Sequence, residues 1–325
     1  MNNINKIFHN GPVPELDRNY YFWRGTNLSD KRLFIIFSSV GAYPGNFSFF
    51  RTFETLNVNV LHITPPDFSW YQNGLNGISD NIETSFVELS SLIESFCHDV
   101  GICEIYITGA SMGGYAAMVY ASLSKKSINL TVISFGTETI LKLKDSKSRQ
   151  FNFDIKKGYR DIRNLNYSGI NVNMIFGEFD MVDSYSALTM SYRKNFNLYS
   201  CQASGHAVPE YFNKKIGIVN FFKSFLNGGK SFIGRGHMPS ELDEFDLIEL
   251  INNDQLSSLY VEALYKCIKK YPAFGYGLNR LGAYLHMKGD LKEAKNALEQ
   301  SLLINPDYQN SLEHLINIKR KLAQT

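Results

Sequence analysis

Residues 109–113 read Gly-Ala-Ser-Met-Gly and place Ser111 between two glycines. A strand-like run, 103–108, precedes this segment, and a run of small residues suited to a helix, 112–124, follows it. A serine in a sharp turn from a strand into a helix presents its hydroxyl as a nucleophile, and the glycines remove side chains that would collide with neighbouring backbone. The pattern favours a nucleophilic Ser111, with an ordinary structural turn as the alternative.

A serine hydroxyl needs a general base, and the base needs an acid that orients it. After a nucleophile of this kind the chain order is acid and then histidine, each after a late strand. His206 follows the predicted strand 196–201 and is the predicted base. Asp180, in the Gly-Glu-Phe-Asp turn after the predicted strand 171–176, is the preferred acid; Asp183 and Glu178 are the alternatives.

Acyl transfer also requires donors for the oxyanion that forms on the attacked carbonyl. The backbone N–H of Met112 is the first predicted donor, because it directly follows Ser111 at the start of a helix. The second donor is expected in the loop Ser-Ser-Val-Gly after the predicted strand 33–38, where the N–H of Val40 or Ser39 is available. A plain glycine turn is the alternative for that loop.

The elements that must carry these residues alternate between strand and helix along the chain. Predicted strands lie at 33–38, 57–63, 103–108, 130–135, 171–176 and 196–201, and predicted helices at 80–98, 112–124, 184–194 and 209–226, the first capped by Asp80 or Ser79. This alternation predicts an α/β fold, a mostly parallel sheet with helices on both faces.

Residues 30–228 resemble the α/β-hydrolase superfamily on the Gly-Ala-Ser-Met-Gly-Gly segment, the Gly-Glu-Phe-Asp turn, the Ser-Gly-His turn and their order. The loop Ser-Ser-Val-Gly departs from the His-Gly of many members. The segments GASMGGYAAM and VISFGTET are further similar to hydrolase-like proteins of bacterial surface-polysaccharide (capsule) synthesis. The resemblance implies an esterase or O-acetyltransferase acting on a carbohydrate or polysaccharide ester, with no cofactor for hydrolysis and acetyl-coenzyme A as donor for transfer.

The chain is predicted to divide into a hydrolase-like domain, 1–228, a glycine-rich linker, 229–241, and a helical domain, 242–325. Residues 137–168 are a candidate cap insertion. Their basic residues could attract an anionic substrate; the alternative is a solvated surface. These residues are Lys142, Lys144, Lys147, Arg149, Lys156, Lys157, Arg160 and Arg163.

The carboxy-terminal segment 275–308 resembles one tetratricopeptide repeat. Gly282 would let its two helices cross closely, and Pro306 would end the second. A single repeat cannot bury its own apolar face. Residues 242–325 are therefore expected to pack on the hydrolase-like domain, to self-associate or to dock a protein partner.

Composition limits the other possibilities. The 325 residues are 44% hydrophobic with a net charge of +2 and no basic run, so no nucleic-acid partner is expected. The amino terminus has no secretory h-region and no apolar run is long enough to span a membrane, so a cytoplasmic location is expected. The rival hypothesis from another class is an inert hydrolase-like scaffold in a glycan-assembly or secretion complex.

Overall fold

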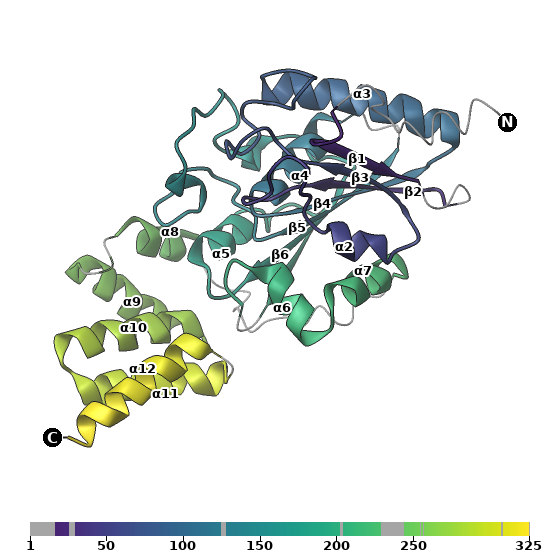
Figure 1. The fold of residues 1–325 in the computed structure, drawn as a ribbon. Helices are drawn as coiled ribbons and strands as arrows, with labels where there is room; N and C mark the ends of the chain where they lie inside the picture. The colour runs from purple at the N-terminus through teal and green to yellow at the C-terminus, as the bar shows by residue number, and fades with distance from the viewer. Residues whose placement is uncertain are drawn as a thin grey trace.

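The structure, a computed structural model, describes residues 17–25, 30–124, 128–201, 204–228, 244–253, 255, 257–306 and 308–324. These residues form a mostly parallel sheet with helices on both faces, and a group of helices at one end of the molecule (Figure 1). The predicted α/β architecture is confirmed at this level. The predicted linker, 229–241, lies outside the described residues.

The strands of the sheet run in the order β1-β3-β2-β4-β5-β6-β7. All neighbouring pairs are parallel except β1 and β3. The turns after the parallel strands therefore meet at one edge, and this edge carries the predicted site residues. The strands are β1 (Tyr21–Arg24), β2 (Arg32–Phe37), β3 (Asn59–Ile63), β4 (Glu104–Ala110), β5 (Asn129–Phe135), β6 (Asn171–Gly177) and β7 (Phe196–Cys201).

Helices connect the strands and cover both faces of the sheet (Figure 1). The helices α3 (Ile82–Val100) and α4 (Met112–Leu123) pack on one face, and α2 (Phe50–Glu54), α6 (Val208–Lys215) and α7 (Ile218–Leu226) pack on the other. Successive side chains of β2 point to opposite faces of the sheet, so both faces are hydrophobic and need to be covered. Ile35 faces α3 and α4, whereas Phe34 and Ile36 face α2 and α7.

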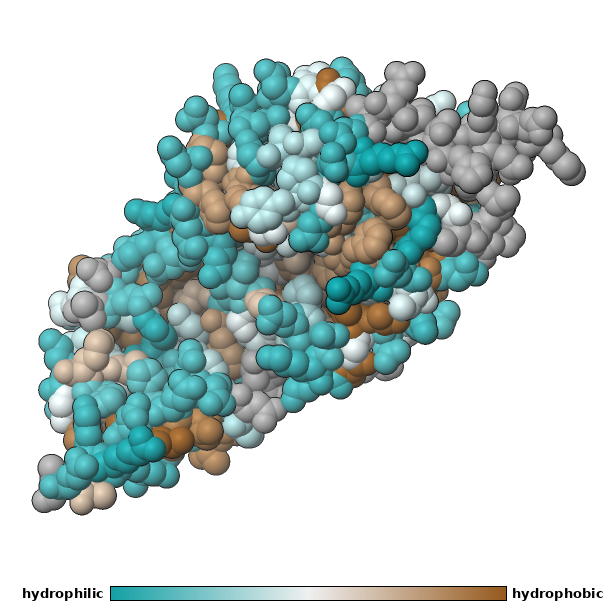
Figure 2. All heavy atoms as spheres, in the orientation of Figure 1, coloured by the Kyte–Doolittle hydropathy of each residue, from teal (hydrophilic) through white to brown (hydrophobic). Residues whose placement is uncertain are grey.

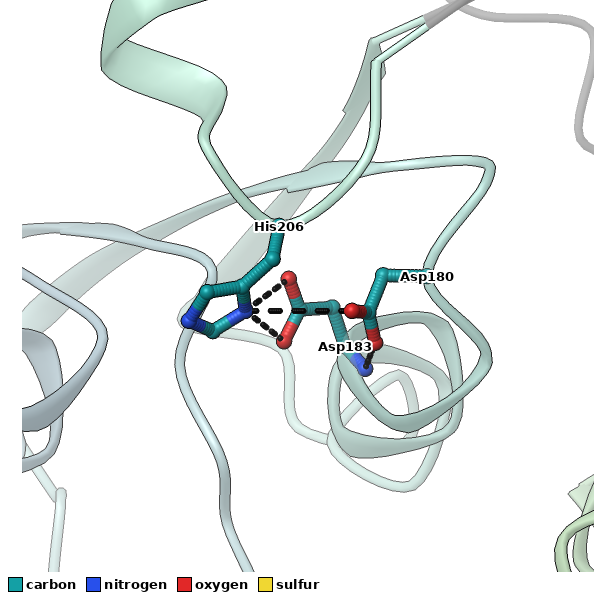
Figure 3. A group of neighbouring side chains, drawn as sticks. All are labelled: Asp180, Asp183 and His206. Carbon is teal, nitrogen blue, oxygen red and sulfur yellow. Dashed lines mark hydrogen bonds and ion pairs between the residues drawn. The ribbon is translucent and has the colours of Figure 1, made fainter. Parts of the chain in front are cut away.

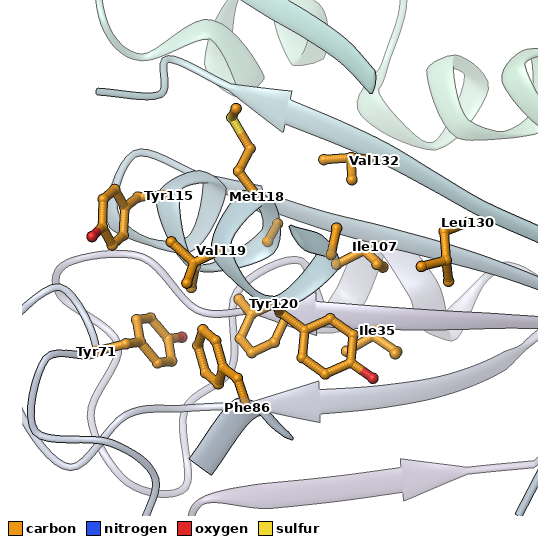
Figure 4. Close-up of a cluster of buried hydrophobic side chains, with 14 of the residues drawn as sticks. Ile35, Tyr71, Phe86, Ile107, Tyr115, Met118, Val119, Tyr120, Leu130 and Val132 are labelled. Atoms are coloured by element: carbon orange, nitrogen blue, oxygen red, sulfur yellow. The ribbon is translucent and has the colours of Figure 1, made fainter. Parts of the chain in front are cut away.

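The helix α4 is buried almost throughout and fixes the position of the turn before it. Its side chains Tyr115, Met118, Val119 and Tyr120 lie among strand residues of β2, β4 and β5 and the rings of Tyr71 and Phe86 (Figure 4). Close packing on this scale leaves the amino-terminal end of α4 little freedom. The residue just before α4 is Ser111.

Residues 137–168 form an irregular segment beside the sheet, which we call the cap. It contains two short helices, η1 (Ser148–Gln150) and η2 (Ile162–Asn164). Several of its side chains are buried in the hydrophobic core beside the sheet. Aromatic packing against Trp70 adds to this attachment. The buried cap residues include Leu141, Tyr159, Ile162 and Tyr167.

The remaining helices form a second group: α8 (Glu244–Asn252), α9 (Ser258–Lys270), α10 (Gly275–Lys288), α11 (Leu291–Ile304) and α12 (Gln309–Leu322). As predicted, α10 and α11 cross closely at Gly282, where an added Cβ would lie 2.6 Å from Leu298 Cγ. Figure 2 shows hydrophobic atoms among the polar surface of this group. No described helix is both long and apolar enough to cross a membrane.

The helix α5 (Met181–Leu188) joins the two parts of the molecule. Its residues Val182 and Tyr185 share one hydrophobic cluster with Leu247 and Leu250 of α8 and with residues of α9. Just before α5, the ring of Phe179 stacks on Tyr308 with centroids 3.5 Å apart. The helical group thus packs against the element that follows β6.

Several predicted boundaries differ from the structure. The residue that caps the amino terminus of α3 is Asn81, rather than the predicted Asp80 or Ser79. Its side chain accepts from Glu83 N and Thr84 N. The predicted helix 209–226 is broken into α6 and α7 at Gly217, whose φ of 80° does not belong to a helix. The predicted helix 184–194 begins earlier, at Met181, and ends at Leu188.

Candidate active site

The turn between β4 and α4 holds Ser111 in an unusual backbone conformation. Its φ is 53° and its ψ is −117°, a combination that L-residues rarely adopt. The turn is held because Ser111 N donates to Phe135 O at 2.8 Å and because α4 is buried behind it. Such strain is typical of functional turns.

Two glycines make this turn possible. An added Cβ on Gly109 would lie 2.3 Å from Gly113 O, and one on Gly113 would lie 2.2 Å from Phe37 O. Both obstacles are backbone atoms, which cannot rotate away as a side chain would. The structure thus places Gly109 and Gly113 in the close contacts that the sequence pattern predicts.

We expect Gly113→Ala to lower the free energy of unfolding by about 1–3 kcal/mol or more, because the new methyl group overpacks a buried backbone contact. Urea denaturation followed by circular dichroism measures the effect. Gly205→Ala is the matched control, since no atom lies within 4 Å of its added Cβ. Equal stability of the two variants would contradict this account.

His206 lies in the loop between β7 and α6 and reaches Ser111. Its Nε2 is 2.8 Å from Ser111 Oγ, although 95 residues separate them in the chain. The approach depends on Gly136 at the end of β5, where an added Cβ would lie 2.8 Å from His206 O. The structure brings together the predicted nucleophile and the predicted base.

Asp183 provides the carboxylate nearest to His206 Nδ1, the ring nitrogen that does not face Ser111. Its two oxygens each lie 3.0 Å from His206 Nδ1, whereas the nearer oxygen of Asp180 lies 3.9 Å away. Figure 3 shows Asp183 between the imidazole and Asp180. The preference for Asp180 in the sequence analysis therefore disagrees with this geometry, which favours the alternative, Asp183.

Asp180 makes a different contact in the structure, which explains why it is not the carboxylate nearest to His206. It caps α5, and its Oδ1 accepts from Asp183 N at 3.0 Å. A carboxylate that caps its own helix is turned toward that helix. Asp183 is then in the first turn of α5 with its side chain fully buried. Glu178, the third alternative, instead accepts from Ser200 Oγ at 2.8 Å.

The signal for Asp183 was present in the sequence. An aspartate followed three residues later by a second acidic residue is typical of a helix start, with the first as the cap. A prediction that the helix begins at Met181 rather than at residue 184 would have identified Asp180 as the capping residue. Asp183 would then have been the preferred partner of the histidine.

Burial and neighbouring charges change the pKa values of this pair. Burial lowers the pKa of His206, but the negative charges of Asp183, Asp180 and Glu138 raise it by a larger amount. The resulting pKa is about 9, against an ordinary 6.5. Burial is the main cause that raises the pKa of the Asp183 carboxyl, and the neighbouring negative charge of Asp180 adds to this increase. The protonated imidazole is therefore stabilised beside Ser111.

This shift predicts the pH dependence of any reaction that uses His206 as a base. The imidazole must be neutral to accept a proton, so kcat/KM should rise as pH increases through the raised pKa. We expect the acidic limb to have its midpoint above 6.5, toward 9. The midpoint belongs to the coupled His206–Asp183 pair. A series of kcat/KM values from about pH 5 to pH 10 measures it, and a midpoint at or below 6.5 would contradict the prediction.

A cavity of about 420 Å³ opens in front of Ser111 and His206. Three further segments complete its wall: the loop after β2 with the start of α2, the cap around η1, and the first turn of α6. The wall residues from these segments are Ser39, Val40, Ser48, Phe49, Lys147, Gln150, Phe151, Ala207, Pro209 and Glu210. Of the wall residues from the cap and α6, the sequence analysis named only Lys147, as one of the basic residues that could attract an anionic substrate.

The two predicted oxyanion donors are the N–H groups of Met112, directly after Ser111, and of Val40, in the cavity wall. Met112 begins α4, and the first N–H groups of a helix have no intrahelical acceptor. Val40 lines the cavity, and its N–H has no acceptor among the described residues. Ser39 N is already used, because it donates to Ser48 Oγ at 3.0 Å. Of the two amides that the sequence left open, Val40 is the available one.

Asp180, Asp183 and His206 also satisfy the spacing of a metal-ligand group, with candidate ligand atoms within 4.8 Å of one another. The hydrogen bond between His206 Nδ1 and Asp183 accounts for this proximity, and the other ring nitrogen faces Ser111. A metal ion on Nδ1 would replace the contact that orients the imidazole toward the serine.

Comparisons with known proteins found matches among solved structures alone, at low sequence identity. No protein-family model matches the chain, and no curated protein matches its sequence. Among solved structures, the chain is similar to MenH from S. aureus (14% identity, TM-score 0.40, 64% of this chain and 98% of that one). It is also similar to Thermogutta terrifontis esterase 2 (14%, 0.43, 62% and 85%) and to alpha/beta hydrolase domain-containing protein 10 from mouse (11%, 0.42, 64% and 93%).

Proposed function

We propose that this protein is a serine-dependent acyl-transfer enzyme of the α/β-hydrolase type that acts on an acyl ester. The observation that supports it is a continuous series of contacts beside the cavity. His206 Nε2 lies 2.8 Å from Ser111 Oγ, and His206 Nδ1 lies 3.0 Å from the Asp183 carboxylate. Hydrogen-bonded groups of these types in this order convert a hydroxyl into a nucleophile.

In the proposed reaction, Ser111 Oγ attacks the ester carbonyl while His206 Nε2 takes the hydroxyl proton. Asp183 accepts from His206 Nδ1–H, which fixes the tautomer and stabilises the imidazolium. His206 then returns the proton to the departing alcohol, leaving an acyl group on Ser111. Water or a second hydroxyl, deprotonated by the same imidazole, removes the acyl group and restores the enzyme.

The N–H groups of Met112 and Val40 are the proposed donors to the oxyanion. A single donor of this kind contributes about 2.7–4 kcal/mol to the stabilisation of the transition state in comparable enzymes. Neither donor requires a side chain, because both are backbone groups at turns that buried packing supports. This part of the site follows from the turn geometry rather than from residue type.

The finer proposal concerns the acceptor and the acyl group. Following the resemblance of GASMGGYAAM and VISFGTET, we propose a carbohydrate or polysaccharide ester as the substrate, either hydrolysed or formed by transfer from acetyl-coenzyme A. Release of free coenzyme A from acetyl-coenzyme A that requires an added glycan would support transfer. Acetate release from an acetylated glycan, without coenzyme A, would support hydrolysis.

The experiment that tests the proposal is labelling with a neutral fluorophosphonate, followed by peptide mass spectrometry. We expect the adduct on Ser111, with labelling lost in Ser111→Ala and strongly slowed in His206→Ala. Absence of labelling in protein shown to be folded would favour the rival hypothesis of an inert scaffold. In that case residues 242–325 would act as a docking module of tetratricopeptide type.

A further inference from the structure

The cap supplies the cavity with one basic side chain, Lys147. It is half-buried, it lines the cavity that contains Ser111, and it forms no ion pair with any other residue that the structure describes. An unpaired cation in a cavity wall attracts anionic groups that enter the cavity.

The other cationic residues of the cap are either committed elsewhere or absent from the cavity wall. Lys142 Nζ donates to Phe151 O and lies over the ring of Phe153. Lys144 Nζ donates to Asn253 O in the helical group. Arg163 pairs with Asp161 at 2.7 Å. The sequence showed a basic segment, and the structure separates Lys147 from the rest of it.

The backbone around Lys147 is held in place by a buried carboxylate. Glu138, 1% exposed, accepts from Ser148 N at 3.0 Å. Ser148 Oγ in turn accepts from Lys142 N at 2.7 Å. These contacts fix the backbone of the turn that carries Lys147, and Lys147 lines the cavity.

The cavity wall also carries an acidic residue, Glu210, in the first turn of α6. No ion pair joins it to Lys147 among the described residues. Glu210 is exposed, and an acidic residue is favourable at the start of a helix without any ligand. Lys147, which has no such structural explanation, is the charge that remains for a substrate.

We propose that the substrate is an acyl ester that carries an anionic group, a carboxylate, phosphate or sulfate, and that Lys147 binds this group. The inference rests on the proposed function and adds the charge of the substrate to it. The anion can lie on the acyl side or on the alcohol side of the ester, and both arrangements would bring it to the same lysine.

The test compares matched esters that differ in charge. On the alcohol side, 4-acetoxybenzoate is paired with its neutral methyl ester; on the acyl side, the 4-nitrophenyl half-ester of succinate is paired with 4-nitrophenyl butyrate. The variants are Lys147→Ala, Lys147→Glu and Lys147→Arg, with Lys157→Ala as control, since Lys157 is an exposed cap lysine outside the cavity wall. Ser111→Ala gives the background rate.

We expect Lys147→Ala to lower kcat/KM for the anionic ester of at least one pair by about tenfold, the size of one charge-assisted contact, and to leave the neutral esters within about twofold. Lys147→Glu should lower it further, Lys147→Arg should retain most of it, and added salt should weaken the preference. The pair that responds identifies the side that carries the anion.

Equal loss on charged and neutral esters, or the same effect from Lys157→Ala, would overturn the proposal about Lys147. The neutral fluorophosphonate separates this result from failure of the proposed function. Labelling of Ser111 without any charge preference rejects the anionic substrate alone. No labelling and no ester hydrolysis rejects the acyl-transfer reaction, and the inference about its substrate is rejected with it.

Discussion

Ser111→Ala is expected to lower kcat for ester hydrolysis by on the order of 10⁶-fold, to the level supplied by the oxyanion donors and binding alone. The loss is large because the hydroxyl is the group that forms the covalent bond, and no neighbouring side chain can replace it. Initial rates with a 4-nitrophenyl ester measure the effect. His206→Ala should give a loss of similar size.

The two substitutions should not add, because nucleophile and base act as one unit. The double variant Ser111→Ala/His206→Ala is therefore expected to be no slower than either single variant. Ser122→Ala is the matched control, since Ser122 lies on the same helix and, among the described residues, donates to Val119 O alone. Residual activity of Ser111→Ala within tenfold of the original would rule out Ser111 as the nucleophile.

Asp183→Asn is expected to lower kcat by about 10⁴-fold, whereas Asp180→Asn should lower it by less than about tenfold. The amide at Asp183 offers His206 a donor and favours the wrong tautomer. The amide at Asp180 keeps the cap of α5, because asparagine caps a helix as well as aspartate does. Parallel rate measurements on the two variants identify the acid that orients the imidazole.

The pH profile adds a second readout to the Asp180 variant. The Asp180 charge helps to raise the pKa of His206, so its removal should move the acidic limb of kcat/KM to lower pH while the plateau is largely kept. A loss of about 10⁴-fold in Asp180→Asn with an active Asp183→Asn would reverse the assignment and restore the sequence-based preference.

The parts of the site that the sequence predicted are those with local causes. Ser111 is defined by the two glycines around it, and His206 by its place between the last strand and a helix. The carboxylate nearest to His206 was harder to predict, because it depends on where α5 begins, and a shift of three residues in that start exchanges Asp180 for Asp183. Element boundaries are the least certain part of a prediction from pattern.

Non-local packing explains the other differences. The strand β1 pairs antiparallel with β3 at the edge of the sheet, and no pattern within Tyr21–Arg24 indicates that partner. A buried contact also attaches the cap, because Tyr159 O accepts from the hydroxyl of Tyr115, which is distant in sequence. Its orientation, which brings Lys147 and Phe151 to the cavity, follows from contacts with Gln72 and Trp70 that are distant in sequence.

The shared position of α5 has a consequence for the molecule as a whole. One side of this helix presents Asp183 to His206, and other residues of the same helix belong to the hydrophobic cluster shared with α8 and α9. Binding events at the two parts are thermodynamically linked if α5 has two orientations and each event favours one of them. A partner that binds the helical group better in one orientation of α5 would change affinity at the cavity, and a substrate in the cavity would change the affinity for that partner by the same factor.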